Sequence, residues 1–377
     1  MNDKTTLRKS LRNRRKTVEN REAASAQAVR NLMETTFFRT AKTVLVYVSI
    51  NSELETQTLI SSLLVDAEKT CVVPYCLPDG ELGLFRLEGE NELAPGAYGI
   101  REPRPELRAT RNVSVEELNL VVLPGVGFDV QGNRLGQGGG YYDRLLRRLP
   151  SQTRTVGLAY ACQKVAELPT EPHDRKIDTL VTEQGVHRFG PHVIGILGGI
   201  ACGKSLVSET FAARGIPVFD ADKTGHEAYH DPAVQEKILR LFGTLDRSAI
   251  AKSVFAKPDA LRALNAAVHP WILEKWCDFY RNATAPTVVL DAALLLETGW
   301  ATWCDTLIFV DTPREKQRAL ARNRGWTDDE LLRRERSQWP LSEKKKKADV
   351  LLKNTGSKDE LRQSILTLYD QLCGIGN

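Results

Sequence analysis

Residues 193–205 read VIGILGGIACGKS, and they decide the architecture of the second half of the chain. The apolar run 193–197 predicts a buried strand, the following loop fits the pattern G-x-x-x-x-G-K-[ST], and a helix is predicted over 205–214. In this pattern, loop N–H groups and the helix N-terminus hold phosphate oxygens, the lysine reaches the β- and γ-phosphates, and the hydroxyl is placed for Mg²⁺. We therefore predict a nucleotide-binding α/β domain; a plain glycine turn is the alternative.

Two carboxylates follow this loop at a spacing that suits phosphoryl transfer. Asp220 and Asp222 come directly after a short predicted strand, 218–219. Ligands of open α/β sheets bind at the carboxyl ends of the strands, so both side chains should lie beside the phosphate loop. One carboxylate could accept a proton from a substrate hydroxyl while the other orients metal-bound water. A helix N-cap pair is the alternative interpretation.

The chain from residue 193 to its end resembles dephospho-CoA kinase. Besides the phosphate loop, the resemblance is carried by Asp220-Ala221-Asp222, Val268-His269-Pro270, Leu294-Leu295-Leu296-Glu297 and Lys347-Ala348-Asp349-Val350. It implies a P-loop domain similar to nucleoside-monophosphate kinases, with a helical insert near 225–285 and a lid near 313–345. The implied reaction transfers the γ-phosphoryl group of ATP to the ribose 3′-hydroxyl of dephospho-CoA.

The kinase resemblance also implies roles for individual residues. Asp222 is expected to be the base, and the other catalytic residues are expected to be Lys204, Asp220, Arg318 and Arg322, with Arg334 as a further candidate. Arg247 and His269 would line the acceptor pocket. ATP would be bound by Gly199, Ile200, Ala201, Cys202, Gly203, Lys204, Ser205 and Leu206, with Ser205 also on Mg²⁺. The arginines could instead be solvated helix faces, and His269 could be a turn residue.

The phosphate loop departs from the kinase pattern. Ala201 replaces a glycine and Cys202 a serine, and Leu206 and Ala293 also replace the usual residues. If position 201 needs a positive φ, alanine costs on the order of 1 kcal/mol there. A weakened loop leaves open a second interpretation, a kinase half that binds nucleotide without turnover. Because a thiol pKa can fall at a helix N-terminus, we also consider that oxidation or alkylation of Cys202 inhibits the kinase.

A second glycine-rich segment, residues 123–144, reads LPGVGFDVQGNRLGQGGGYYDR. A predicted buried strand ends in a Pro-Gly turn, and a loop with four glycines leads into a helix that starts at Tyr141. Successive N–H groups of such a loop can form an anion nest. Arg134 can fork onto a phosphate, Asp143 could share a metal with that phosphate, and the two tyrosines could stack on a flat ring. A merely flexible loop is the alternative.

Residues 4–183 closely resemble 5-formyltetrahydrofolate cyclo-ligase, also called methenyltetrahydrofolate synthetase. The resemblance is carried by this segment together with Tyr47-Val48-Ser49, Glu53-Leu54-Glu55-Thr56 and Val181-Thr182-Glu183. It implies a three-layer α/β/α domain. In the implied reaction ATP phosphorylates the formyl oxygen of 5-formyltetrahydrofolate, N10 attacks the activated carbon, and loss of phosphate gives 5,10-methenyltetrahydrofolate. Catalysis then rests mainly on positioning and charge neutralisation.

This second resemblance assigns a further set of residues. Val48 and Glu53 would contact the folate, and Asp143 and Asp174 would hold Mg²⁺. ATP would be bound by Lys4, Arg8, Arg134, Leu135, Gly136, Gln137, Gly138, Gly139, Gly140, Tyr141 and Tyr142. Glu53 could instead be an acidic residue at a helix N-terminus. We expect the remaining basic residues of the first helix to be a solvated face: Lys9, Arg12, Arg14, Arg15 and Lys16.

Length and composition agree with two enzyme domains. The chain has 377 residues, and we predict domains at 1–187 and 193–377 joined by a short linker, 188–192. Lys and Arg number 52 against 48 Asp and Glu, a net charge of +4 that argues against a nucleic-acid partner. No apolar run reaches the roughly 18 residues of a membrane span, and seven scattered cysteines do not suggest a disulfide framework. We therefore expect a cytosolic bifunctional enzyme that uses ATP, Mg²⁺ and small-molecule substrates.

Strands alternate with helices in both halves, which predicts largely parallel sheets covered on both faces. One basic helix is expected over residues 5–33, and the chain after residue 313 is expected to be helical. The run Lys344–Lys347 is expected to be a solvated face.

Overall fold

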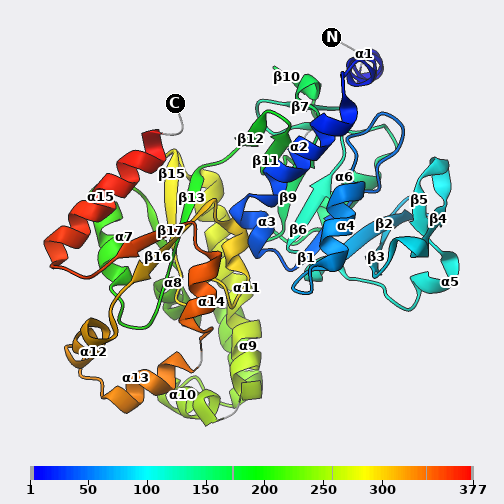
Figure 1. Ribbon diagram of the computed structural model, residues 1–377. Helices are drawn as coiled ribbons and strands as arrows, with labels where there is room; N and C mark the ends of the chain where they lie inside the picture. The colour runs from blue at the N-terminus through cyan, green and yellow to red at the C-terminus, as the bar shows by residue number, and fades with distance from the viewer. Residues whose placement is uncertain (1–3, 172–173, 257, 337, 375–377) are drawn as a thin grey trace. The chain divides into compact units, whose positions relative to one another are not determined.

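The computed structural model describes residues 4–171, 174–256, 258–336 and 338–374 (Figure 1). The chain divides into two compact units, residues 1–190 and 191–377. The last strand of the first unit ends at Arg188, and the first strand of the second begins at His192. No helix within the described ranges combines the length and the apolar character needed to cross a bilayer.

The first unit is built on a seven-stranded sheet in the order β12-β11-β9-β6-β1-β2-β3. The five inner strands are parallel, and the two edge strands are antiparallel to their neighbours. The strands are β1 (Thr43–Val46), β2 (Thr70–Cys76), β3 (Leu82–Leu87), β6 (Leu120–Leu123), β9 (Arg154–Leu158), β11 (Thr179–Thr182) and β12 (Gly185–Arg188). The largely parallel sheet is thus confirmed, and the edge strand β12, at the end of the predicted first domain, was not among the expected strands.

Alternation along the inner strand β1 gives this unit its three layers. Val44 and Val46 pack into one core with α2, α3 and α4, whereas Leu45 points to the opposite core with Leu145 and Leu146 of α6. The helices are α1 (Lys4–Lys16), α2 (Arg21–Met33), α3 (Thr36–Thr40), α4 (Gln57–Val65), α5 (Pro105–Arg108) and α6 (Tyr141–Arg148). Short strands outside the main sheet are β4 (Leu93–Pro95), β5 (Arg101–Pro103), β7 (Gly127–Asp129), β8 (Arg134–Leu135) and β10 (Lys164–Val165).

The single basic helix expected over residues 5–33 is wrong, because the chain breaks between α1 and α2. Asn20 adopts a left-handed conformation, with φ 45°, and its side chain accepts a hydrogen bond from Ala23 N at 3.2 Å. This N-cap starts a new helix. The two helices also pack differently: Leu11 of α1 joins a small core with Val126 and Leu135, whereas α2 packs on the main sheet.

The second unit has a fully parallel five-stranded sheet in the order β14-β15-β13-β16-β17. Its strands are β13 (His192–Gly198), β14 (Val218–Asp220), β15 (Thr287–Asp291), β16 (Thr306–Asp311) and β17 (Val350–Lys353). Strand β17 contradicts the expectation that the chain after residue 313 is helical. It is an edge strand in which only Leu352 is buried, so its apolar pattern is weak.

Helices cover both faces of this sheet as predicted. Ile194 and Ile196 face a core shared with α7 and α15, and Val193 and Leu197 face a core shared with α8–α11. The helices are α7 (Lys204–Ala213), α8 (Ala221–Glu227), α9 (Pro232–Phe242), α10 (Arg247–Ala256), α11 (Pro258–Asn282), α12 (Arg314–Arg322), α13 (Asp328–Glu335), α14 (Leu341–Lys347) and α15 (Lys358–Gly374). Helices α8–α11 occupy the region of the expected insert, and α12–α14 that of the expected lid.

Candidate active sites

The phosphate-loop pattern forms the connection between β13 and α7. Gly203 is the N-cap of α7 with φ 97°, and a Cβ there would lie 2.9 Å from Asn354 Nδ2. Lys204 Nζ donates to the Gly199 carbonyl at 2.9 Å, so the ammonium group lies over the loop. Ser205 is exposed in the first turn of α7. The loop therefore presents a cation, a hydroxyl and a helix N-terminus in one place.

Two strand ends bring carboxylates together next to this loop. Asp220 ends β14, Asp291 ends β15, and the two residues are register partners in adjacent strands. Asp220 caps α8 by accepting from Lys223 N at 2.8 Å, so the N-cap alternative holds for this residue. Asp222 follows in the first turn of α8; part of its surface is exposed, and the surrounding protein covers the rest.

Burial and nearby charges act on the pKa of Asp222. The surrounding protein raises the pKa of Asp222 by desolvation, and the charges of Asp220 and Asp291 raise it further. A backbone hydrogen bond at Ala293 and the charge of Lys204 act in the opposite direction. The structure thus brings together three predicted catalytic residues, Lys204, Asp220 and Asp222.

Asp291 is a functional candidate that sequence reasoning missed. Its half-buried carboxylate accepts a hydrogen bond from Ser208 Oγ. Desolvation raises the pKa of Asp291, opposed by the Ser208 hydrogen bond and by the charge of Lys204. The signal was available, because Asp291 directly follows the apolar run Val288-Val289-Leu290, just as Asp220 follows the strand 218–219.

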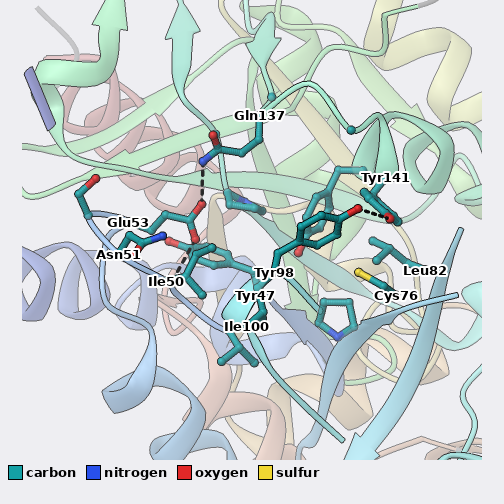
Figure 2. Close-up of a pocket in the computed structure, with 18 of the residues that line it drawn as sticks. Tyr47, Ile50, Asn51, Glu53, Cys76, Leu82, Tyr98, Ile100, Gln137 and Tyr141 are labelled. Carbon is teal, nitrogen blue, oxygen red and sulfur yellow. Dashed lines mark hydrogen bonds between the residues drawn. The ribbon is translucent and has the colours of Figure 1, made fainter. Parts of the chain in front are cut away.

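The first unit contains a cavity of about 840 Å³ that gathers most residues predicted for its site (Figure 2). Its walls come from the glycine loop, from the segment after β1 and from α1. The predicted residues that line it are Val48, Glu53, Arg134, Gly136, Gln137, Gly139, Gly140, Tyr141, Tyr142 and Asp143. Leu135 is instead a core residue. Arg8 contacts the glycine loop, because its Nε donates to the Gly136 carbonyl at 2.9 Å.

Glu53 is the buried acid of this cavity, with 8% of its surface exposed. Burial raises the pKa of Glu53, whereas Arg15, a hydrogen bond from Ile50 N and one from Gln137 lower it. Helix α4 begins only at Gln57, so the alternative that Glu53 is an acid at a helix N-terminus is wrong. A buried, hydrogen-bonded carboxylate facing a cavity can accept hydrogen bonds from a ligand.

Two basic residues expected on a solvated face lie in the site. Arg15 is 4% exposed, and its Nε donates to Ser52 Oγ at 3.0 Å. Arg12 donates to Gln137 Oε1 at 2.6 Å. With Arg8 they follow a spacing of four and then three residues, which places all three on one helix face. That spacing could have identified them, whereas Lys9 and Arg14 are exposed as predicted; Lys16 is exposed but also lines the cavity.

Arg134 and Asp143 are already paired with each other in the cavity. Arg134 Nη2 forms an ion pair with Asp143 Oδ1, and Nη1 donates to the Pro124 carbonyl at 3.2 Å. The buried Nε of Arg134 has no hydrogen-bond partner. The structure places the other predicted metal ligand, Asp174, near Lys4, at 3.9 Å from its Nζ.

Comparison with known proteins assigns a family to each unit. Residues 192–360 match the family model described as dephospho-CoA kinase, and residues 1–183 match that of the 5-formyltetrahydrofolate cyclo-ligase family. The dephospho-CoA kinase of Geobacillus kaustophilus is 37% identical over 193 residues, which are 47% of this chain and 95% of that protein. The chain belongs to both families, one in each half.

The chain is also similar to two further proteins. The dephospho-CoA kinase of Thermus thermophilus is 37% identical over 192 residues, 49% of this chain and 93% of that protein. The solved structure of the 5,10-methenyltetrahydrofolate synthetase of Aquifex aeolicus is 34% identical to this chain. The match covers 49% of this chain and 92% of that one, with a TM-score of 0.44.

The unusual alanine of the kinase loop adopts the conformation that favours glycine. Ala201 has φ 55°, so the condition for a backbone cost is met. Its methyl group is nevertheless buried, in a cluster with Ala321 of α12 and Leu331 of α13. This packing against α12 and α13 offsets part of the cost.

Cys202 is a core residue of the kinase half. Its side chain is 3% exposed and packs with Val207 and Phe211, and the adjoining Leu206 contacts the same core. The Cys202 carbonyl accepts from Thr312 Oγ1 at 2.6 Å and from Asn354 Nδ2 at 2.9 Å. Burial withholds the thiol from reagents, which argues against inhibition by its modification.

The predicted acceptor residues lie on two helices of the kinase insert. Arg247, at the start of α10, is exposed, donates to His226 Nδ1 and lies 5.0 Å from the centroid of the Tyr229 ring. His269 lies inside α11, which continues through Pro270, so the turn alternative is wrong. Burial lowers the pKa of His269, whose ring lies 5.7 Å from that of Trp300.

The lid arginines of the kinase half are paired within the lid. Arg318 and Arg322 are exposed and lie 3.7 and 3.4 Å from Asp328 Oδ2. Arg334 contacts Glu330 Oε1 at 2.9 Å. The buried Gln317, which sequence reasoning missed, instead reaches the phosphate loop and donates from Nε2 to the Ile200 carbonyl at 2.6 Å.

One lysine of the run expected on a solvated face is buried in the kinase half. Lys344 is 1% exposed, and its Nζ lies 2.8 Å from Glu297 Oε1 and 3.0 Å from Gln338 Oε1. Desolvation lowers the pKa of Lys344, and Glu297 opposes that effect. The reason is that α14 packs on β13 and β16 and turns this one side chain inward.

Proposed function

We propose that the kinase half transfers the γ-phosphoryl group of ATP to the ribose 3′-hydroxyl of dephospho-CoA. The observation that carries this proposal is the convergence of Lys204 with Asp220, Asp222 and Asp291 at the ends of three neighbouring strands. The 3′-oxygen forms a bond to the γ-phosphorus while the bond to the β–γ bridging oxygen breaks, and Asp222 accepts the hydroxyl proton. Its raised pKa makes it a stronger base than an ordinary aspartate.

The other residues of the kinase half neutralise and orient the phosphates. Lys204 exchanges its bond to the Gly199 carbonyl for the phosphate oxygens. Arg318, Arg322 and Arg334 leave their carboxylate partners when the lid closes over the nucleotide. Lid closure would exclude water from the phosphoryl transfer.

Mg²⁺ would fit this site through oxygen donors alone. Ser205, Asp220 and Asp291 would hold it, directly or through water, and the bound ion neutralises phosphate charge. Within the described residues no group of three or more His, Cys, Asp or Glu is arranged to hold a metal ion. That agrees with Mg²⁺ sites in which substrate phosphates and waters supply most ligands.

The cyclo-ligase half converts 5-formyltetrahydrofolate into 5,10-methenyltetrahydrofolate with ATP. The observation that supports this is that Glu53 and the glycine loop face one cavity. The formyl oxygen takes the γ-phosphoryl group and ADP leaves. N10 then bonds to the formyl carbon and loses its proton, and the C–O bond breaks to release phosphate. Glu53 and Val48 bind the folate, the glycine loop with Lys4, Arg8 and Arg134 binds ATP, and Asp143 and Asp174 would hold Mg²⁺.

The test uses the full-length chain with ATP and Mg²⁺. We expect CoA from dephospho-CoA, detected by mass, and 5,10-methenyltetrahydrofolate from 5-formyltetrahydrofolate, detected by absorbance. Asp222→Asn should abolish only the first product and Glu53→Gln should sharply reduce only the second. Nucleotide binding without CoA would instead establish a non-catalytic kinase half, which its 37% identity to named kinases does not favour.

Compartment and partners complete the proposal. The chain acts in the cytosol on small molecules, without nucleic-acid or membrane partners. The near-neutral net charge of +4 supports this part of the proposal.

A further inference from the structure

Glu53 is held from two sides by groups that belong to different parts of the cyclo-ligase half. On one side Ile50 N donates to Glu53 Oε2 at 3.3 Å, and the charge of Arg15, from α1, opposes the pKa rise that burial causes in Glu53. On the other side Gln137 Nε2 donates to Glu53 Oε1 at 3.3 Å, and Figure 2 shows this side chain reaching down from the glycine loop. The Gln137 amide therefore connects Glu53, the carboxylate proposed to bind the folate, with the loop proposed to bind ATP, 84 residues away along the chain.

The same glutamine is also tied to α1. Arg12 donates to Gln137 Oε1 from Nη2 at 2.6 Å and from Nε at 3.0 Å, and to the Gln137 carbonyl at 3.2 Å. Arg8 donates to the neighbouring Gly136 carbonyl at 2.9 Å. These bonds orient the amide so that its NH₂ group points at Glu53.

The loop that carries Gln137 is rich in glycine and exposed, so its backbone is open to a bound anion. Gly138 and Gly140 have φ values of 110° and 71°, and residues 137–139 are exposed. Phosphate oxygens on the loop N–H groups would restrict this segment to one conformation. Whatever orders the loop also orders the Gln137 side chain over Glu53.

We propose that Gln137 is a positioning residue that couples nucleotide binding in the glycine loop to folate binding at Glu53. The inference rests on the function proposed for the cyclo-ligase half. A nucleotide that orders the loop fixes the amide on Glu53 and so prepares the carboxylate for the folate. By linkage, bound folate strengthens nucleotide binding by the same factor.

The experiment titrates 5-formyltetrahydrofolate into the full-length chain, with and without a saturating non-hydrolysable ATP analogue. Folate is the titrant because the nucleotide also binds the kinase half. We compare wild type, Gln137→Met, which keeps the length but lacks the amide, and the control Gln131→Met. Gln131 is exposed on the turn between β7 and β8 and does not line the cavity.

We expect the analogue to tighten folate binding at least about five-fold in wild type and in Gln131→Met, the lower end of ordinary coupling factors. In Gln137→Met that factor should fall to about one, while folate binding without nucleotide changes less, because Arg15 and Ile50 still hold Glu53. An equal factor in wild type and Gln137→Met, or no coupling in wild type, would overturn the inference. Wild type that binds no folate would overturn the proposed function as well.

Discussion

At the scale of single residues, Ala201 combines a strained backbone with a packed methyl group. Ala201→Gly removes a left-handed cost of about 1 kcal/mol but also removes the contact with Ala321 and Leu331 and loosens the unfolded chain. We expect these effects to cancel to within about 1 kcal/mol in the free energy of unfolding. Ala201→Val, whose β-branched side chain suits φ 55° poorly, should cost at least about 1 kcal/mol.

Tryptophan fluorescence during urea unfolding measures both variants in the full chain. All six tryptophans lie in the kinase half, at positions 271, 276, 300, 303, 326 and 339, so the signal follows that half alone. Stabilisation of Ala201→Gly by clearly more than 1 kcal/mol would show that the methyl contact contributes nothing.

Asp220 offers a pH test of the proposed base. Its negative charge disfavours ionisation of Asp222, so removing that charge lowers the pKa of Asp222. Asp220→Asn keeps an N-cap residue at the start of α8. Because only ionised Asp222 accepts a proton, the acid limb of kcat/KM for CoA formation should move to lower pH.

A matched control is Asp231→Asn, which also replaces the carboxylate of an N-cap, at α9. The charge of Asp231 does not contribute to the raised pKa of Asp222. An acid limb that stays in place in Asp220→Asn, or moves equally in both variants, would argue against Asp222 as the base.

At the scale of elements, α14 is attached to the kinase core through a buried ion pair. Lys344→Met leaves Glu297 without its cation, and breaking a buried pair in this way costs roughly 3–5 kcal/mol. Lys345→Met removes an exposed pair with Asp311, worth about 0–1 kcal/mol. In urea unfolding followed by tryptophan fluorescence, Lys344→Met should lower the free energy of unfolding more than Lys345→Met. Equal losses in the two variants would contradict a structural role for Lys344.

The elements also show where local patterns suffice. The strand 193–197 and the helix after it were predicted because all of their signals are local. The apolar run, the loop glycines and the start of the helix lie within about twenty residues of one another. The break between α1 and α2 depended on one N-cap, Asn20, inside an otherwise helical pattern. Strand β17 was missed because an edge strand with one buried side chain carries little apolar signal.

At the scale of the whole molecule, the two activities should be independent. Each hydrophobic core cluster draws its residues from one unit, so each unit has a core of its own. We expect chains of residues 1–190 and 191–377, produced separately, to show the kcat and KM of the corresponding reaction of the full chain. A change of more than about three-fold in either reaction would indicate coupling between the halves.

The sequence by itself determined the two phosphate-binding loops, the α/β class of both halves and the residues that flank each loop. These features depend on neighbours in the chain, because glycine content, strand–loop–helix order and cap positions act over a few residues. The families followed from the same short motifs. Most predicted residues of the first site do line one cavity.

Tertiary structure alone decided which distant side chains meet. Arg15 and Lys344 look like members of basic runs, yet packing buries both beside carboxylates. Asp291 lies at the kinase site because the strand order sets β15 between β13 and β14. Gln137 contacts Glu53 because of how the glycine loop folds. The physical reason is that burial and pairing of charges depend on which elements the sheet brings together, and chain spacing does not record that.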